Sequence, residues 1–110
     1  MLSTPGAIGG SFAARDGEMV DWFGEATDSF RMAVLTAHVG VIVAHVESAF
    51  GTLHFGAPRE IIFEHEQLTI LVGPVADGYF ALLALAPTSA LQRARTMMRV
   101  AVARLRREMG

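Results

Sequence analysis

Two histidines near the middle of the chain carry the clearest metal-binding chemistry. His38 and His45 stand seven positions apart in a stretch of helical pattern, which places them about 10.5 Å apart along one helix. Zinc–nitrogen bonds of about 2.0–2.1 Å cannot join them within one chain, and the His-Glu-x-x-His spacing is absent. Ligation across a dimer axis stays open as an alternative. We expect both rings at the seam of the helix, half-exposed or hydrogen-bonded to a partner, and we predict no metal site.

A second titratable group, Glu64, His65 and Glu66, contains the ingredients of a general base, because a carboxylate beside an imidazole can orient it. Neighbours along a strand point to opposite faces, however, so Glu64 and His65 would not face each other. The Gly-x-Ser-x-Gly pattern of a nucleophilic serine is also missing. We therefore expect a solvated hairpin tip, and we predict no catalytic residue.

Glycines near the start of the chain, Gly6, Gly9 and Gly10, could suggest a phosphate-binding loop. The chain has no lysine, so the Walker pattern is impossible, and Gly-x-Gly-x-x-Gly is absent as well. Close backbone packing beneath a helix explains these glycines better. We predict no bound cofactor.

Arginines are concentrated at the end of the chain. From Thr88 onward six arginines face one acid, Glu108, for a charge of +5, whereas the first 87 residues hold three arginines and ten acids, for −7. A basic helix can meet nucleic acid or an anionic membrane, but the aromatic platforms and lysine-rich groove of a nucleic-acid binder are missing. Arg31, Arg59 or a C-terminal arginine could act as an arginine finger. We expect these arginines to pair with surface carboxylates instead. The six arginines that follow Thr88 are Arg93, Arg95, Arg99, Arg104, Arg106 and Arg107.

Composition indicates one globular domain spanning residues 1–110. Apolar residues make up 52% of the 110, which argues against intrinsic disorder. The absence of cysteine excludes disulfides and thiolate chemistry. No uninterrupted apolar run reaches the roughly 18 residues of a membrane span, and the first ten residues lack a signal-peptide pattern. We expect a soluble, cytoplasmic protein.

The stretch from Asp28 to Phe50 predicts a helix with two apolar faces. One stripe is bulky and suits the core: Met32, Leu35, Val39, Ile42, Val43, Val46 and Phe50. The nearly opposite stripe is mostly small, and polar residues hold only the seams, with Thr36 and Glu47 on one side. Because one face suffices for the chain's own core, the second predicts helix pairing in a dimer. The small stripe comprises Phe30, Ala33, Val34, Ala37, Val41, Ala44 and Ser48.

Strand patterns flank that helix. Ala7–Ala14 and Glu18–Phe23 are joined by Asp16-Gly17, the signal of a type I′ hairpin turn. Asp28 or Ser29 should cap the helix, and Gly51 should follow its end at C′. Three more strands are predicted, and a final helix follows Pro87, capped by Thr88 or Ser89. The strands are Arg59–His65, Leu68–Val72 and Tyr79–Ala86, and the inward stripe of the final helix is Leu91, Met98, Ala101, Val102, Leu105 and Met109.

Short turns between neighbouring strands make antiparallel hairpins. The predicted fold is therefore α+β, with one five-stranded antiparallel sheet, the long central helix on one face and the C-terminal helix on the other. The unusually apolar strands fit a sheet that is covered on both sides.

The order of elements resembles the roadblock family of dynein light chains. The resemblance rests on the first half of the chain, in this order: Pro5-Gly6-Ala7-Ile8, a strand, Asp16-Gly17, a second strand and the long helix with its stripe of small residues. The Tyr79–Ala86 strand and the Ser89–Arg107 helix match the family's order as well, so the resemblance covers nearly the whole chain as a single roadblock-like domain. Family members usually begin with a helix, whereas here only Met1 to Gly6 precede the first strand. One sheet face must then be covered by the C-terminal helix alone or by another protein.

The resemblance implies a homodimer formed through the central helix and the following edge strand, which joins two sheets into one of about ten strands. Ile61 and Phe63 of that strand would join the small stripe in the dimer interface. It also implies a partner among the small Ras-like GTPases, with the chain acting as a regulator, GTPase-activating protein or scaffold, and some members are dynein-associated subunits. Arg31, His38 and His45 are the candidate partner contacts.

The expected function is thus a non-enzymatic homodimer that binds a small Ras-like GTPase and modulates its nucleotide cycle. One alternative is a structural adaptor that links larger proteins without binding a GTPase. Another is a small-ligand sensor with a pocket between sheet and helix, although the bulky core stripe argues against an internal cavity.

Overall fold

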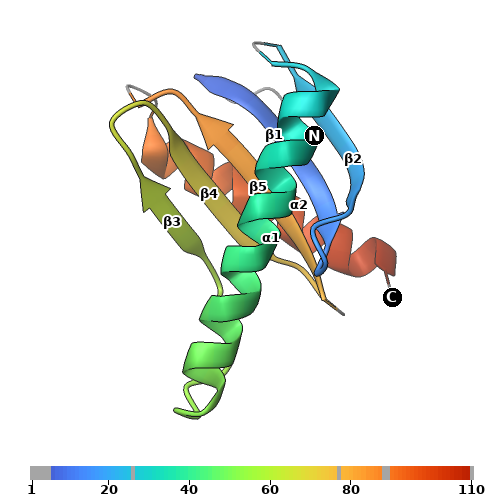
Figure 1. Cartoon of the computed structure of the whole chain (residues 1–110), viewed down its shortest axis with the longest axis vertical. Coiled ribbons are helices and arrows are strands. Elements are labelled where there is room, and N and C mark those ends of the chain that lie inside the picture. The colour runs from blue at the N-terminus through green and yellow to red at the C-terminus, as the bar shows by residue number, and fades with distance from the viewer. Residues whose placement is uncertain (1–5, 26, 77, 88–89, 110) are drawn as a thin grey trace.

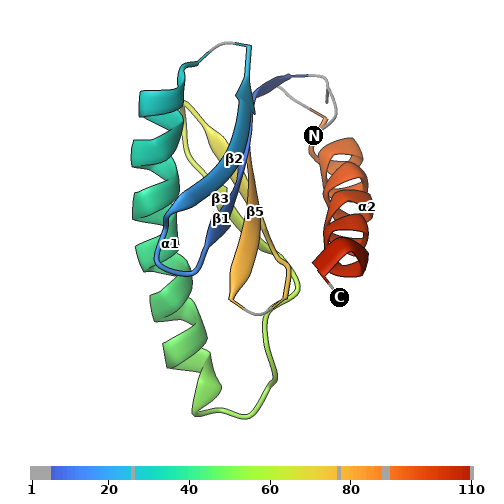
Figure 2. The ribbon, with the colours of Figure 1, turned by 90° about the vertical axis from the view of Figure 1, so that its right-hand side faces the viewer.

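The computed structural model describes residues 6–25, 27–76, 78–87 and 90–109. Its strands form one antiparallel sheet in the order β2-β1-β5-β4-β3, with a helix on each face (Figures 1 and 2). This arrangement confirms the predicted α+β architecture, including the position of β3 at an edge. In chain order the elements are β1 (Ala7–Ala14), β2 (Met19–Gly24), α1 (Ser29–Gly51), β3 (Ile61–Glu64), β4 (Thr69–Pro74), β5 (Tyr79–Leu85) and α2 (Leu91–Met109).

The middle of the sheet is buried on both faces, as the nearly continuous apolar runs of β4 and β5 predicted. Two separate cores result. The core between the sheet and α1 is built around Met32, Val39, Val43, Ile70, Val72, Phe80 and Leu82, and the core between the sheet and α2 around Leu71, Val75, Leu83, Leu85, Ala94 and Met98.

The hairpin that joins β1 to β2 differs from the predicted type I′ turn. The Ala14 N–H donates to the Glu18 carbonyl at 3.0 Å and the Gly17 N–H to the Ala14 carbonyl at 2.8 Å. Gly17 alone has a positive φ, 86°, whereas a type I′ turn needs two such residues. Asp16 instead accepts a hydrogen bond from the Glu18 N–H through its carboxylate, at 2.9 Å. The connection is therefore a longer loop that closes on one glycine.

The ends of α1 confirm one predicted cap and correct the other. Asp28 is the N-cap, because its carboxylate accepts the Arg31 N–H at 2.9 Å. The prediction that Gly51 lies beyond the helix at C′ was wrong: Gly51 is the last helical residue and Thr52 is the C-cap. The positive φ values that follow belong to His54 and Gly56. The predicted α2 caps, Thr88 and Ser89, lie outside the described residues.

Two other predictions about α1 were wrong. Thr36, placed on the polar seam, is fully buried, and its hydroxyl lies 2.7 Å from that of Ser11 on β1. Ile42 and Phe50, placed in the inward stripe, are 42% and 45% exposed. A 23-residue helix is about 34 Å long, and the far end of α1 extends past the edge of the sheet (Figure 1). Its last turns therefore have no sheet to bury their apolar side chains.

A glycine pair sets the close approach of α1 to the β1–β2 hairpin. A Cβ at Gly40 would lie 2.8 Å from the Gly17 Cα and 3.1 Å from the Gly17 nitrogen. Both neighbours are backbone atoms, so neither can move aside without moving the hairpin.

On the other face, α2 packs on β4 and β5. A Cβ at Gly73 would lie 2.7 Å from a Val102 methyl group, so this glycine lets α2 approach β4 closely. The Arg95 guanidinium contacts the Glu60 carboxylate at 2.8 Å, and hydrogen bonding to that carboxylate raises the pKa of Arg95. Arg106 donates to the Val75 carbonyl at 3.0 Å. Of the six residues predicted to point inward from α2, all but Ala101 belong to the core between the sheet and α2, and Ala101 is half-buried.

We expect Gly40→Ala to destabilise the protein by about 1–3 kcal/mol, because the added methyl group meets backbone atoms in a packed contact. Gly51→Ala is the matched control, since it changes the same residue type in the same helix with nothing within 4 Å of the added Cβ. Higher helix propensity should make that control neutral or slightly stabilising. Urea unfolding measures both, and equal stability of the two variants would contradict the close contact.

We expect Thr36→Val to cost about 1–3 kcal/mol, because it leaves the Ser11 hydroxyl buried without a partner. The double variant Ser11→Ala with Thr36→Val removes both hydroxyls and should recover part of that loss. A double-mutant cycle by denaturant unfolding measures the coupling. Additive effects of the two substitutions would show that the hydroxyls do not interact.

Candidate protein–protein interface

The surface of α1 that points away from the sheet is unusually apolar for an exposed helix. Of the ten large apolar side chains exposed among the described residues, three lie on this surface: Phe30, Val34 and Val41. Phe30 is 75% exposed and Val41 is 56% exposed. Large contiguous apolar patches of this kind mark interaction sites.

The predicted small-residue stripe lies on this surface, which we call the outer face of α1. Between its larger members, Phe30, Val34 and Val41, the side chains are small, so another backbone can approach closely. Only Ala33 of the stripe is half-buried, and the other six members are exposed: Phe30, Val34, Ala37, Val41, Ala44 and Ser48.

The two interface residues predicted on β3 are in a different environment. Ile61 and Phe63 are half-buried and pack against the core beneath α1. Because α1 approaches β1 and β2 most closely, these side chains lie at the margin of its cover. The outer edge of β3 has no strand partner among the described residues. The strand thus presents half-covered apolar side chains and an unpaired backbone edge beside α1.

Arg31, His38 and His45 form a polar stripe along one flank of the outer face, because positions seven apart nearly superpose on a helix. The Nδ1–H of His38 donates to the Val34 carbonyl at 2.8 Å, and the Nδ1–H of His45 to the Val41 carbonyl at 2.9 Å. Each ring therefore lies along its own helix and leaves Nε2 unused. Arg31 lies 3.8 Å from Asp28. The three side chains share one stripe but do not converge on one point.

A second apolar cluster at the far end of α1 was missed in the sequence. Phe50 and Phe55 have ring centroids 6.1 Å apart, and Leu53 between them is also exposed. The available signal was the loop itself, because large apolar residues in a short loop have no element to bury them.

The remaining candidate residues are either exposed to solvent or closely packed, and neither environment forms a binding site. Glu64, His65 and Glu66 are exposed at the β3–β4 hairpin. No group of three His, Cys, Asp or Glu side chains among the described residues could hold a metal. A Cβ at Gly9 would meet Met32 and the Phe23 carbonyl, and one at Gly10 the Phe23 ring. Close packing beneath a helix is confirmed for Gly9, whereas Gly10 packs against the ring of Phe23 on the neighbouring strand.

By length and hydropathy α1 would also pass as a membrane span, a test that the core helix of a soluble protein passes equally. In this fold, buried side chains of α1, such as Met32 and Val43, pack against the sheet.

No protein-family model and no curated protein matches this sequence. Solved structures match its fold across almost the whole chain. A Roadblock/LC7 domain from Streptomyces avermitilis is 16% identical, with 96% of this chain and 87% of that chain covered and a TM-score of 0.83. The gliding protein MglB from Thermus thermophilus is 17% identical over 93% of this chain and 77% of its own, with a TM-score of 0.82. MglB in a tetrameric arrangement, also 17% identical, covers 93% and 76% with a TM-score of 0.83.

The five-stranded order, the two helices on opposite faces and these matches agree with the resemblance that the sequence predicted. The chain has the fold of the Roadblock/LC7 domain proteins, among them the MglB gliding proteins.

Proposed function

We propose that this chain is a non-catalytic, homodimeric regulatory module that binds a small Ras-like GTPase. The observation that carries the proposal is the exposed apolar outer face of α1, which one chain cannot bury. The tetrameric arrangement of the similar MglB supports assembly of copies through this fold. The GTPase rests on what the roadblock resemblance implies.

In the proposed dimer the outer faces of two α1 helices pack together. The alanines let the helix axes approach to about 8–10 Å, and Phe30 and Val41 fill the spaces between them. The edge strands β3 then meet or lie adjacent, so that Ile61 and Phe63 are covered by the second copy. This single association would bury the apolar surface that the described residues leave open on this side of the sheet.

The flank stripe of Arg31, His38 and His45 would remain at the rim of the paired helices, once from each chain. Positively charged and hydrogen-bonding side chains at a rim suit recognition of another protein. Such a platform would bind the GTP-bound switch conformation of the GTPase more tightly than the GDP-bound one. It would then shift the GTPase toward the GTP-bound conformation, or it would speed hydrolysis by ordering the catalytic groups of the GTPase. The nucleotide stays on the partner.

Val41→Asp should convert the dimer to a monomer of 11.8 kDa, because a carboxylate buried between two apolar helices loses its hydration. Ala37→Arg should act in the same way by steric overlap. Light scattering after size exclusion measures the mass. Val20→Asp is the matched control, since Val20 is 60% exposed and belongs to β2 rather than to the outer face of α1 or to β3, and it should keep the wild-type mass. If Val41→Asp also keeps that mass, the outer face is not the interface.

Co-elution with a Ras-like GTPase from the same genome, loaded with GDP or a GTP analogue, tests the partner. We expect GTP-selective binding that Arg31→Ala weakens by about fivefold or more, the effect of an interface arginine worth about 1 kcal/mol. Arg99→Ala, an exposed arginine on the opposite side of the sheet, should bind like the wild type. Hydrolysis rates with and without the chain distinguish an activating regulator from an effector. Binding that ignores the nucleotide, or no binding, would contradict the proposal and favour the structural adaptor.

A further inference from the structure

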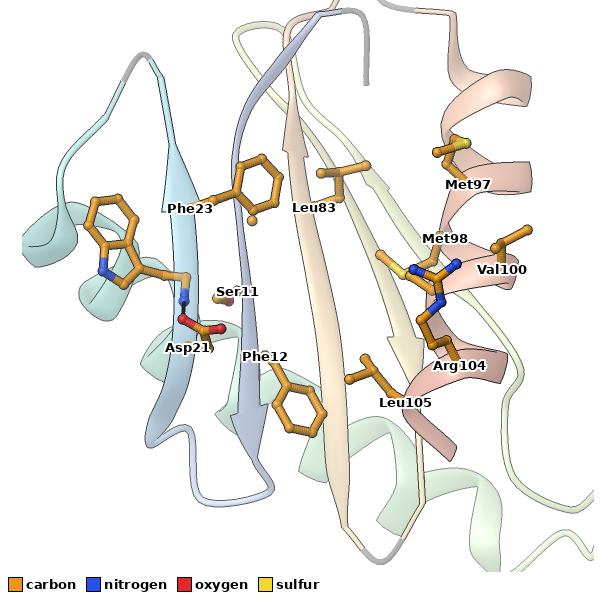
Figure 3. Close-up of a pocket in the computed structure, with 13 residues that line it drawn as sticks. Ser11, Phe12, Asp21, Phe23, Leu83, Met97, Met98, Val100, Arg104 and Leu105 are labelled. Atoms are coloured by element: carbon orange, nitrogen blue, oxygen red, sulfur yellow. Dashed lines mark hydrogen bonds between the residues drawn. The ribbon is translucent and has the colours of Figure 1, made fainter. Parts of the chain in front are cut away.

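A groove of about 200 Å³ lies between the sheet and α2, on the face opposite α1. Its lining is mainly apolar, although the sequence had predicted no cavity between sheet and helix. Figure 3 shows Phe12, Phe23 and Leu83 on the sheet side, and Met97, Met98 and Leu105 on the α2 side.

The groove exists because α2 is anchored off the centre of the sheet. One flank of α2 is held near β4 by three contacts: the close approach at Gly73, the Arg95–Glu60 ion pair and the hydrogen bond from Arg106 to the Val75 carbonyl. The opposite flank therefore stops short of β1 and β2. Phe12 and Phe23, which belong to those two strands and point to this face, are only partly buried.

The rim of the groove is charged in a defined pattern. At 100° per residue, Arg93 and Arg104 fall on the groove flank of α2, three turns or about 16 Å apart. Both are exposed, and neither has an ion-pair partner among the described residues. Asp21 of β2 lines the opposite wall. The α2 rim is thus positive, and the β2 rim carries an acid.

The dimensions favour protein side chains over a small molecule. Drug-sized ligands occupy pockets of about 300–1,000 Å³, and this groove is smaller. A trough beside a helix, apolar at its base and charged at its rims, suits the apolar side chains of another helix, spaced at i, i+3 or i+4 and i+7. Glutamates on such a helix would meet Arg93 and Arg104.

We propose that this groove binds an amphipathic helix of a partner protein, with acidic residues on the flank that faces α2. The site lies across the sheet from the outer face of α1, so it is independent of the proposed dimer. The monomeric variant Val41→Asp should bind the same helix, which separates a failure of this proposal from a failure of the proposed function.

The test uses two synthetic helical peptides of about 18 residues, close to the length of α2. Both carry leucines at i, i+3 or i+4 and i+7. The acidic peptide has glutamates eleven positions apart on one flank and glutamines elsewhere, and the basic peptide has lysines in place of those glutamates. Fluorescence anisotropy with the full chain measures binding. We expect the acidic peptide to bind with a Kd between millimolar and micromolar and about fivefold or more tightly than the basic peptide.

Arg104→Glu should reverse that preference by weakening the acidic peptide about fivefold and strengthening the basic one. Arg99→Glu is the matched control, because Arg99 is an exposed arginine of the same helix on the other flank. It should keep the wild-type preference. A third peptide, with serines in place of the leucines, should lose binding if the apolar base of the groove contributes.

Equal weakening by the two arginine variants would overturn the proposal, since it would indicate general charge attraction. No saturable binding of the acidic peptide would also overturn it. If Arg104→Glu lowers the mass of the chain in solution, a second copy fills the groove instead. If small apolar molecules raise the melting temperature where the peptides fail, the occupant is a ligand, and the proposal is wrong.

Discussion

The sheet is apolar on both faces, and the rest of the structure depends on how that surface is covered. Five strands about 4.8 Å apart make a sheet roughly 20 Å wide, whereas a helix with its side chains is about 10–12 Å across. One helix on each face therefore covers only part of it. The chain places α1 closest to β1 and β2 and α2 over β4 and β5. Each face keeps an open side, and the two open sides lie at opposite edges of the sheet.

Glycines decide where each helix sits, and hence which side stays open. Gly40 and Gly17 bring α1 against the first hairpin, and Gly73 brings α2 against β4. At each of these glycines an added side chain would collide with backbone or packed atoms. A helix that moved to the centre of the sheet would lose this close contact. The close contacts at these glycines therefore determine which parts of the sheet each helix leaves uncovered.

The sequence predicted most of the fold because its signals are local. Alternating and continuous apolar runs, the Asp28 cap and the small stripe of α1 depend only on neighbouring residues, and the structure agrees with them. The errors concern tertiary packing. Thr36 can be buried because Ser11 of β1 supplies its hydrogen-bond partner, and Phe50 is exposed because α1 continues past the end of the sheet (Figure 1). The sequence predicted that the C-terminal helix alone, or another protein, would cover one sheet face, but the position of the groove depends on where Gly73 anchors α2.

The two open sides lie on opposite faces of one thin sheet, with different surface chemistry. The outer face of α1 is apolar with a rim of Arg31 and two histidines, whereas the groove beside α2 is apolar between an arginine rim and Asp21. Two separate partners could then bind the two sides at once without contacting each other. Because β1 and β5 are hydrogen-bonded neighbours in the sheet between the two surfaces, a partner on one side would affect the other side only by displacing a helix. The two proposed sites would then bind their partners independently.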